Sequence, residues 1–89
     1  MKAVVTVVGE DRVGIIAQVC TQLAKYNVNV LDISQTVMQG FFTMMMVVDV
    51  SAANVPLAQL AQDLDEQGKA MELSIRLQRQ DIFDAMHKI

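Results

Sequence analysis

The residues best suited to bind a ligand lie close together in the segment 9–17, which reads Gly-Glu-Asp-Arg-Val-Gly-Ile-Ile-Ala. The apolar pattern before this segment is typical of a strand, and the pattern after it is typical of a helix. The first backbone N–H groups of a helix have no internal partners, and the positive end of the helix dipole lies beside them. They therefore suit the carboxylate of a small ligand. Gly14 has no Cβ and would let such a ligand approach the backbone closely.

The same segment also has a purely structural interpretation. Asp is among the preferred N-cap residues, so Asp11 or a neighbour can cap the helix, and Gly14 can serve only for packing. Arg12 is either a solvated loop cation or, through its bidentate guanidinium, a partner for a carboxylate. Both interpretations remain open from the sequence.

The rest of the chain offers no set of residues that predicts catalysis. Cys20, the single cysteine, falls on the apolar side of a helical pattern, and His87, the single histidine, lies near the C-terminus. A nucleophile needs a base within hydrogen-bond reach, and these positions do not suggest such a pair. No phosphate-binding lysine loop and no spacing typical of metal ligands occurs. We therefore expect no catalytic residues, no metal, no cofactor and no enzymatic activity.

Composition narrows the functional classes further. The 89 residues carry a formal net charge of −3, whereas nucleic-acid binding requires a positive surface. The longest apolar stretch, Phe41–Val50, is too short to cross a membrane. Glu10, Asp11 and Arg12 come before a signal-peptide core could form, and a single cysteine excludes an internal disulfide. We therefore expect a cytoplasmic protein that binds neither nucleic acid nor membranes.

Apolar periodicity predicts six main elements and a tail. Strands are expected at 2–8, 28–38, 41–50 and 71–78, and helices at 13–26 and 56–68. Gln39-Gly40 is expected to form a tight hairpin turn with positive φ at Gly40. Gly68 is expected to end the second helix. Residues 81–89 are expected to form a short terminal helix with Ile82, Phe83 and Met86 on one side.

The order strand, helix, strand, strand, helix, strand predicts an α+β, ferredoxin-like fold for the whole chain as one domain, 1–89, with a helical tail at 79–89. Right-handed crossovers favour a four-stranded antiparallel sheet in the order 4-1-3-2, with both helices on one face. The strand at 41–50 is expected to be central and covered on both faces. Because an apolar sheet face is rarely left in water, we expect a homodimer, or coverage by the terminal helix.

Two motifs give the chain a family resemblance. Gly9-x-Asp11-Arg12-x-Gly14-Ile15-Ile16-Ala17, followed by Asn27-Val28-Asn29-Val30-Leu31-Asp32-Ile33, resembles the ACT domain. The pattern is similar to the ACT units of the glycine-cleavage transcriptional repressor and of formyltetrahydrofolate deformylase. It is closer still to stand-alone bacterial ACT-domain proteins of unassigned function. The resemblance covers the whole chain in element order. It departs from the family at Val13, where proline is usual, and at Asn27, where glycine is usual.

The resemblance implies a ligand site, because ACT domains of amino-acid biosynthetic enzymes bind an amino acid where two domains meet. The implied site combines the loop after the first strand with the start of the second strand, and it contains Asp11, Arg12, Val13, Gly14, Ile15, Asn29 and Asp32. Loop N–H groups would hold the carboxylate, and the Asn29 side chain would reach the ammonium group or the side chain of the ligand. Asn29 can instead satisfy a strand end, and Asp32 can protect an edge strand.

Two functional hypotheses follow. In the first, the chain is a regulatory module whose homodimer, or higher homo-oligomer, senses an amino acid or a similar metabolite between subunits. In the second, it is an interaction module without a ligand that docks on an enzyme or a regulator. The resemblance favours the first hypothesis.

Overall fold

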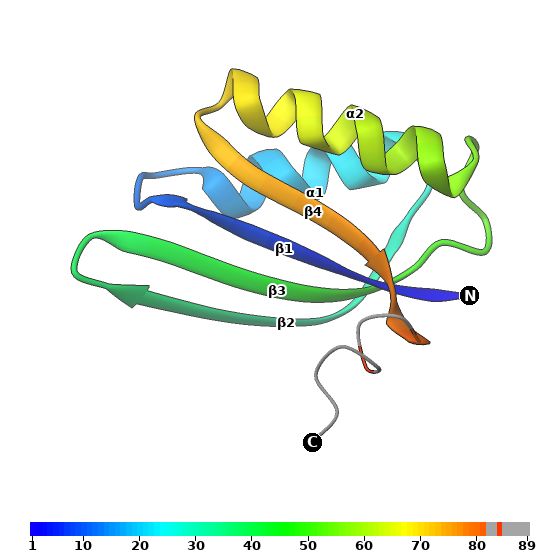
Figure 1. Cartoon of the computed structure of the whole chain (residues 1–89), viewed down its shortest axis with the longest axis horizontal. Helices are drawn as coiled ribbons and strands as arrows, with labels where there is room; N and C mark the ends of the chain where they lie inside the picture. Colours follow the sequence, from blue (N-terminus) through cyan, green and yellow to red (C-terminus); the bar gives the residue numbers. More distant parts are fainter. Residues whose placement is uncertain (82–83, 85–89) are drawn as a thin grey trace.

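The computed structural model describes residues 1–81 and Asp84. The element order is β1 (Lys2–Glu10), α1 (Ile15–Lys25), β2 (Asn29–Met38), β3 (Phe41–Asp49), α2 (Leu57–Ala70) and β4 (Leu73–Arg79). Both helices lie on the same face of the sheet (Figure 1). The predicted ferredoxin-like fold is therefore confirmed. Of the expected helical tail, Arg79 belongs to β4, and most of 81–89 lies outside the described residues.

The four strands form one antiparallel sheet in the order β2-β3-β1-β4, as predicted. The turn between β2 and β3 has positive φ at both of its residues, 52° at Gln39 and 83° at Gly40. Two consecutive residues of positive φ are the requirement of the tight hairpin turn that matches the strand twist. The hairpin leaves β2 as one edge of the sheet, and β4 is the other edge.

The core lies between the sheet and the two helices. Alternate residues of β1 and β3 point into it, and Val5, Val7, Met44 and Met46 are each completely buried there. The helices contribute Ile15, Val19, Leu23, Leu60 and Leu64. This alternation is the geometric consequence of the strand period of two residues.

The expectation that β3 is covered on both faces is wrong for the single chain. Its burial alternates strictly from Phe41 to Met46, and Met45 is 38% exposed. The helices cover only one face, so the near-continuous apolar run reflects two different surroundings. We call the other side, formed by Val4, Thr6, Val8, Met45 and Val47 with their neighbours, the open face. Exposure varies along it, from 5% at Val4 to 38% at Val8.

Gly68 does not end the second helix, which continues to Ala70. A Cβ at Gly68 would lie 2.9 Å from both the Leu73 carbonyl oxygen and Cγ1 of Ile75. Atoms at that separation overlap, so glycine at this position lets α2 approach β4 closely. The residue serves packing between the helix and the strand.

None of the described helices is long and apolar enough to cross a membrane.

Candidate functional site

The loop between β1 and α1 begins at Asp11 and ends at Gly14, which occupies the N-cap position of α1 with φ 92°. No described side chain caps the helix, and the first turn contains no acidic residue. The first i to i−4 hydrogen bond of the helix is donated by the Gln18 N–H to the Gly14 carbonyl oxygen at 2.9 Å. The N–H groups of the preceding turn therefore have no side-chain acceptor among the residues described. The interpretation of Asp11 as a helix cap is wrong.

Asp11 instead connects the loop to the β2–β3 hairpin. Its backbone N–H donates a hydrogen bond to the Gly40 carbonyl oxygen at 2.9 Å. The loop and the hairpin turn accordingly lie at the same end of the sheet (Figure 1). This backbone contact fixes the position of the loop relative to the hairpin turn.

The side chain of Arg12 contacts a different segment of the fold, the turn between α2 and β4. Its guanidinium donates a hydrogen bond to the carbonyl oxygen of Met71, which lies in the turn between α2 and β4. A small hollow of about 200 Å³ lies beside this contact. Arg12 thus anchors the loop to the turn, and in this arrangement part of its hydrogen-bonding capacity is already used.

A second hollow, of about 240 Å³, lies under the loop at the start of α1. We call it the loop pocket, and it is lined by Asp11, Arg12, Gly14, Ile15, Ile16, Ala17, Gln35, Val37 and Phe42. Four of the seven predicted site residues are therefore brought together here. Val13 lies in the same loop, but its side chain is fully exposed. The pocket combines a polar rim, made by the loop and the helix start, with a mostly apolar interior.

The structure does not bring Asn29 and Asp32 to the loop pocket of the same chain. Asn29 is paired with Asp49, whereas Met38, at the other end of β2, is paired with Phe41 beside the loop. Nine residues of a strand span about 30 Å. A single chain therefore separates the two halves of the predicted site by almost the full length of the sheet.

The surroundings of Asn29 are polar and partly paired. Asp49, the residue of β3 that pairs with Asn29, accepts a hydrogen bond of 2.9 Å from the Ser51 N–H. Hydrogen bonds from the Ser51 hydroxyl and backbone lower the pKa of Asp49, and the amino group of Met1, 3.6 Å away, adds to this effect. Asp49 is thus an anchored anion, and a cationic group approaching Asn29 would meet negative charge.

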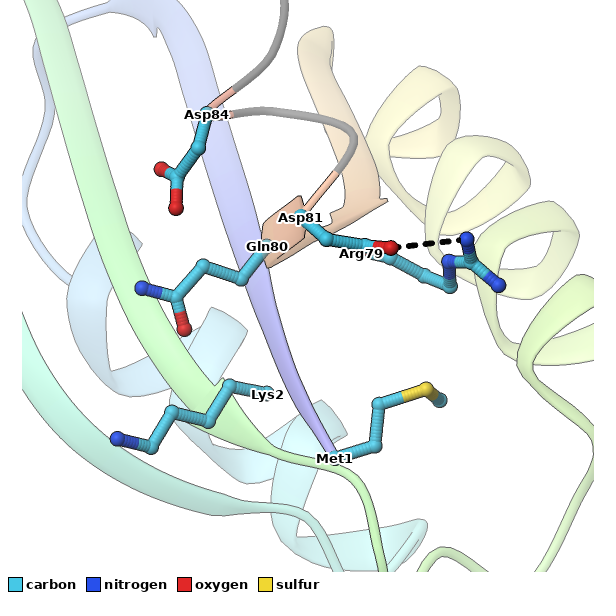
Figure 2. Close-up of a pocket in the computed structure, with 6 residues that line it drawn as sticks. All are labelled: Met1, Lys2, Arg79, Gln80, Asp81 and Asp84. Atoms are coloured by element: carbon cyan, nitrogen blue, oxygen red, sulfur yellow. Dashed lines mark hydrogen bonds and ion pairs between the residues drawn. The ribbon is translucent and has the colours of Figure 1, made fainter.

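A further hollow of about 460 Å³ lies at this end of the sheet (Figure 2). It is lined by Met1, Lys2, Arg79, Gln80, Asp81 and Asp84. Arg79 and Asp81 form an ion pair at 3.0 Å. The mixture of both signs of charge gives no field that selects one kind of ligand, and no predicted site residue lines this hollow. Across the described part of the chain, no cluster of His, Cys, Asp or Glu could hold a metal ion.

Five residues that line the pocket were not predicted as site residues: Ile16, Ala17, Gln35, Val37 and Phe42. Ile16 and Ala17 belong to the motif that contains the predicted loop. Val37 and Phe42 were apolar strand residues like many others. Gln35 did carry a signal, because it lies between Ile33 and Val37 at the alternate positions of a strand whose other residues there are apolar. A polar residue in that row indicates either an exposed edge or a site.

Comparison with known proteins gives a consistent result. Residues 2–78 match the ACT domain family. A UPF0237 protein of Bifidobacterium longum is 51% identical over 88 residues, covering 99% of this chain and 98% of its own length. An ACT domain protein from Streptococcus pneumoniae superposes with a TM-score of 0.83 at 39% identity, covering 94% of both chains.

The fold also occurs as part of a larger protein. A formyltetrahydrofolate deformylase from Pseudomonas putida superposes with a TM-score of 0.75, covering 88% of this chain and 28% of the deformylase. At 15% identity this likeness shows the fold alone.

Proposed function

Because this chain belongs to the ACT domain family, we propose that it is a regulatory module whose homodimer binds a small metabolite, an amino acid, in the loop pocket. One observation carries the proposal. The uncapped start of α1 and the Asp11–Gly14 loop form the rim of a hollow that lies beside the exposed edge strand β2.

The rim suits the backbone-like part of an amino acid. The N–H groups at the start of α1 carry partial positive charge and would donate hydrogen bonds to the ligand's carboxylate. Asp11 is among the residues that line the same hollow, and its carboxylate would offer an acceptor for the ammonium group. Gly14 leaves open space at this point, because no atom beyond its adjacent residues lies within 4 Å of where its Cβ would be.

The edge strand supplies the reason for dimerisation. Every residue from Leu31 to Met38 is exposed, and Ile33 and Val37 are exposed apolar side chains at 40% and 54%. A long edge strand with apolar side chains and unpaired backbone groups is a template for pairing with another chain. Pairing between two copies of β2 would extend the sheet from four strands to eight.

Such a dimer would also reunite the predicted site. In an antiparallel pair of β2 strands with the two-fold axis near Ser34, Asn29 of the partner subunit would lie beside Met38. That is the end of the sheet where the loop after β1 meets the hairpin turn. The separation of about 30 Å between Asn29 and the loop within one chain would then be bridged by the second subunit. In the register, Asn29 shares its row with Asp49, Val47 and Met45 of the open face, so its side chain would reach the ligand from that side of the edge and not from inside the loop pocket.

The alternative function is a protein-interaction module without a ligand. The open face, with Val8 and Met45 each 38% exposed, is the observation in its favour. Partners would then meet the sheet, and the loop pocket would have no ligand. The two functions differ in whether a small molecule stabilises the isolated protein.

The test is a thermal-shift panel of amino acids and related metabolites at about 5 mM. A ligand with a dissociation constant near 100 μM would add about 2 kcal/mol of stability at that concentration. For a domain of this size that corresponds to a rise in melting temperature of roughly 10 °C. We expect one compound, or a few related ones, to produce this shift.

Variants locate the site. Asn29→Ala should abolish the shift, and Ser74→Ala, at an exposed position of the opposite edge strand β4, should leave it unchanged. A flat panel with the wild-type protein would overturn the sensor function, and pull-down of protein partners would become the next experiment.

A further inference from the structure

The helix-covered face of the sheet is apolar at almost every position, with one exception in β2. Its inward positions are Ala3, Val5, Val7, Val30, Ile33, Val37, Phe42, Met44, Met46, Val48, Leu73, Ile75 and Leu77. Gln35 lies among them, paired with Met44 and flanked by Ile33 and Val37. Within this row of the described strands, it is the single polar side chain between the strand ends. A polar side chain in this row costs free energy once the row is closed to water, unless it finds a hydrogen-bond partner there.

Gln35 lines the loop pocket together with the first turn of α1. Across residues 1–81 and Asp84, no group forms a hydrogen bond with its side-chain amide. The neighbouring pocket walls are the apolar side chains of Ile15, Ile16 and Val37. The amide is therefore a free donor and acceptor in an otherwise apolar part of the pocket.

The proposed dimer would change the surroundings of Gln35 from solvent to protein. Gln35 is exposed in the single chain because β2 is an edge. Pairing of β2 with a second copy would remove water from that edge. The amide would then require a partner inside the pocket, because an unpaired buried amide costs more than a paired one gains.

We propose that Gln35 determines which amino acids the pocket accepts, selecting side chains that end in a neutral hydrogen-bonding group, a hydroxyl or a carboxamide. This inference rests on the proposed function. A carboxamide can both donate to and accept from the Gln35 amide, and a hydroxyl can do the same through one atom. An aliphatic side chain would leave the amide unpaired, which is the kind of loss from which strong discrimination arises. The volume of about 240 Å³ admits a molecule of amino-acid size.

The experiment measures dissociation constants by calorimetry for three probes, L-glutamine, L-serine and L-leucine. The proteins are the wild type, Gln35→Met and Thr36→Val. Methionine keeps the length of the glutamine side chain and removes its hydrogen-bonding groups. Thr36 is the neighbouring residue on the same strand and points to the opposite face, so Thr36→Val is the matched control.

We expect the wild type to bind L-glutamine or L-serine at least ten-fold more tightly than L-leucine. Gln35→Met should erase or reverse this preference, and Thr36→Val should preserve it. If the wild type binds a probe and Gln35→Met keeps the same ranking, the role of Gln35 is overturned and the sensor function stands. If the wild type prefers L-leucine, the assigned ligand class is wrong. If neither these probes nor any compound of the thermal-shift panel binds the wild type, the proposed function fails, and the inference fails with it.

Discussion

The backbone N–H of Asp11 lies 2.9 Å from the carbonyl oxygen of Gly40 and donates a hydrogen bond to it. The contact joins two segments that are almost thirty residues apart in the sequence. It makes the geometry of the hairpin turn part of the geometry of the loop pocket. Changes in the turn should therefore reach the loop.

The first prediction concerns this turn. Gly40 has φ 83°, and no atom beyond its adjacent residues lies within 4 Å of its hypothetical Cβ. Gly40→Ala should thus act through backbone strain alone and reduce the free energy of unfolding by about 1 kcal/mol. Amide exchange at Asp11 should accelerate at the same time. Gln39→Gly is the matched control of opposite sign, because Gln39 already has φ 52° and glycine relieves that strain. Denaturant unfolding and NMR hydrogen exchange measure both effects.

The second prediction concerns the close approach of α2 to β4. Replacing a glycine inside a helix by alanine normally stabilises the helix by about 1 kcal/mol. At Gly68 the new Cβ would meet the Leu73 carbonyl oxygen at 2.9 Å, and backbone cannot move aside as a flexible side chain can. We expect Gly68→Ala to lower the free energy of unfolding by about 1–3 kcal/mol. Ala58→Gly, at an exposed position of the same helix, calibrates the propensity term. A more stable Gly68→Ala protein would contradict the packing role.

The third prediction concerns the alkaline limb of stability. The Tyr26 hydroxyl donates to Oδ2 of Asp63 at 2.9 Å and accepts from Nε2 of Gln67 at 3.3 Å. The hydrogen bond to Asp63, and then burial, raise the pKa of Tyr26 above its ordinary value of 10.0. A raised pKa means that the folded state favours the protonated phenol. This stabilisation is complete below pH 10 and is lost as the pH rises through the folded-state pKa.

Tyr26→Phe should therefore cost about 1 kcal/mol at neutral pH, the usual net value of one such hydrogen bond. It should also flatten the fall in stability above pH 10. Urea titrations at several pH values test both parts. Equal slopes in wild type and variant would exclude a contribution from this phenol.

The fourth prediction concerns the edge strand. Ile33 is a helix-side residue of β2 and is 40% exposed in the single chain. Ile33→Lys would bring two like charges close together in the proposed dimer, and lysine is the residue that protects natural edge strands from pairing. We expect the dimer to dissociate at protein concentrations at least ten-fold higher than for the wild type. Ala58→Lys makes the same kind of change at an exposed position of α2, which packs against the opposite edge strand β4, and should have no effect. Sedimentation velocity distinguishes these outcomes, and an unchanged Ile33→Lys dimer would place the interface elsewhere.

Element types and strand order could be predicted because they depend on local periodicity. The alternation in β4 and the spacing of Val19, Leu23, Leu60 and Leu64 are readable one segment at a time. The role of Gly68 could not be read in this way, since it depends on a strand that approaches from a later part of the chain. The two faces of β3 look alike in sequence for the same reason: both carry apolar residues, and only the helices decide which face is covered.

The site was predictable to the extent that it is contiguous in sequence. The loop from Asp11 to Gly14 forms one rim because strand, turn and helix follow one another directly. Gln35 was not predicted as a pocket residue, because its place in the pocket depends on strand pairing and on the position of α1 above β2. Asn29 and the loop belong to opposite ends of the sheet, a relation that follows from the antiparallel register and not from any local pattern.

The three consecutive methionines of β3 have a chemical consequence. Met44 and Met46 are completely buried, whereas Met45 presents its thioether on the open face. A mild oxidant adds oxygen to accessible methionine sulfur and converts the side chain to a polar sulfoxide. In the folded protein the middle residue should react first, and its two neighbours should react only when the sheet opens. Peptide mass spectrometry of the 44–46 run after peroxide treatment would thus report strand register and local unfolding together, and coverage of the open face would protect Met45.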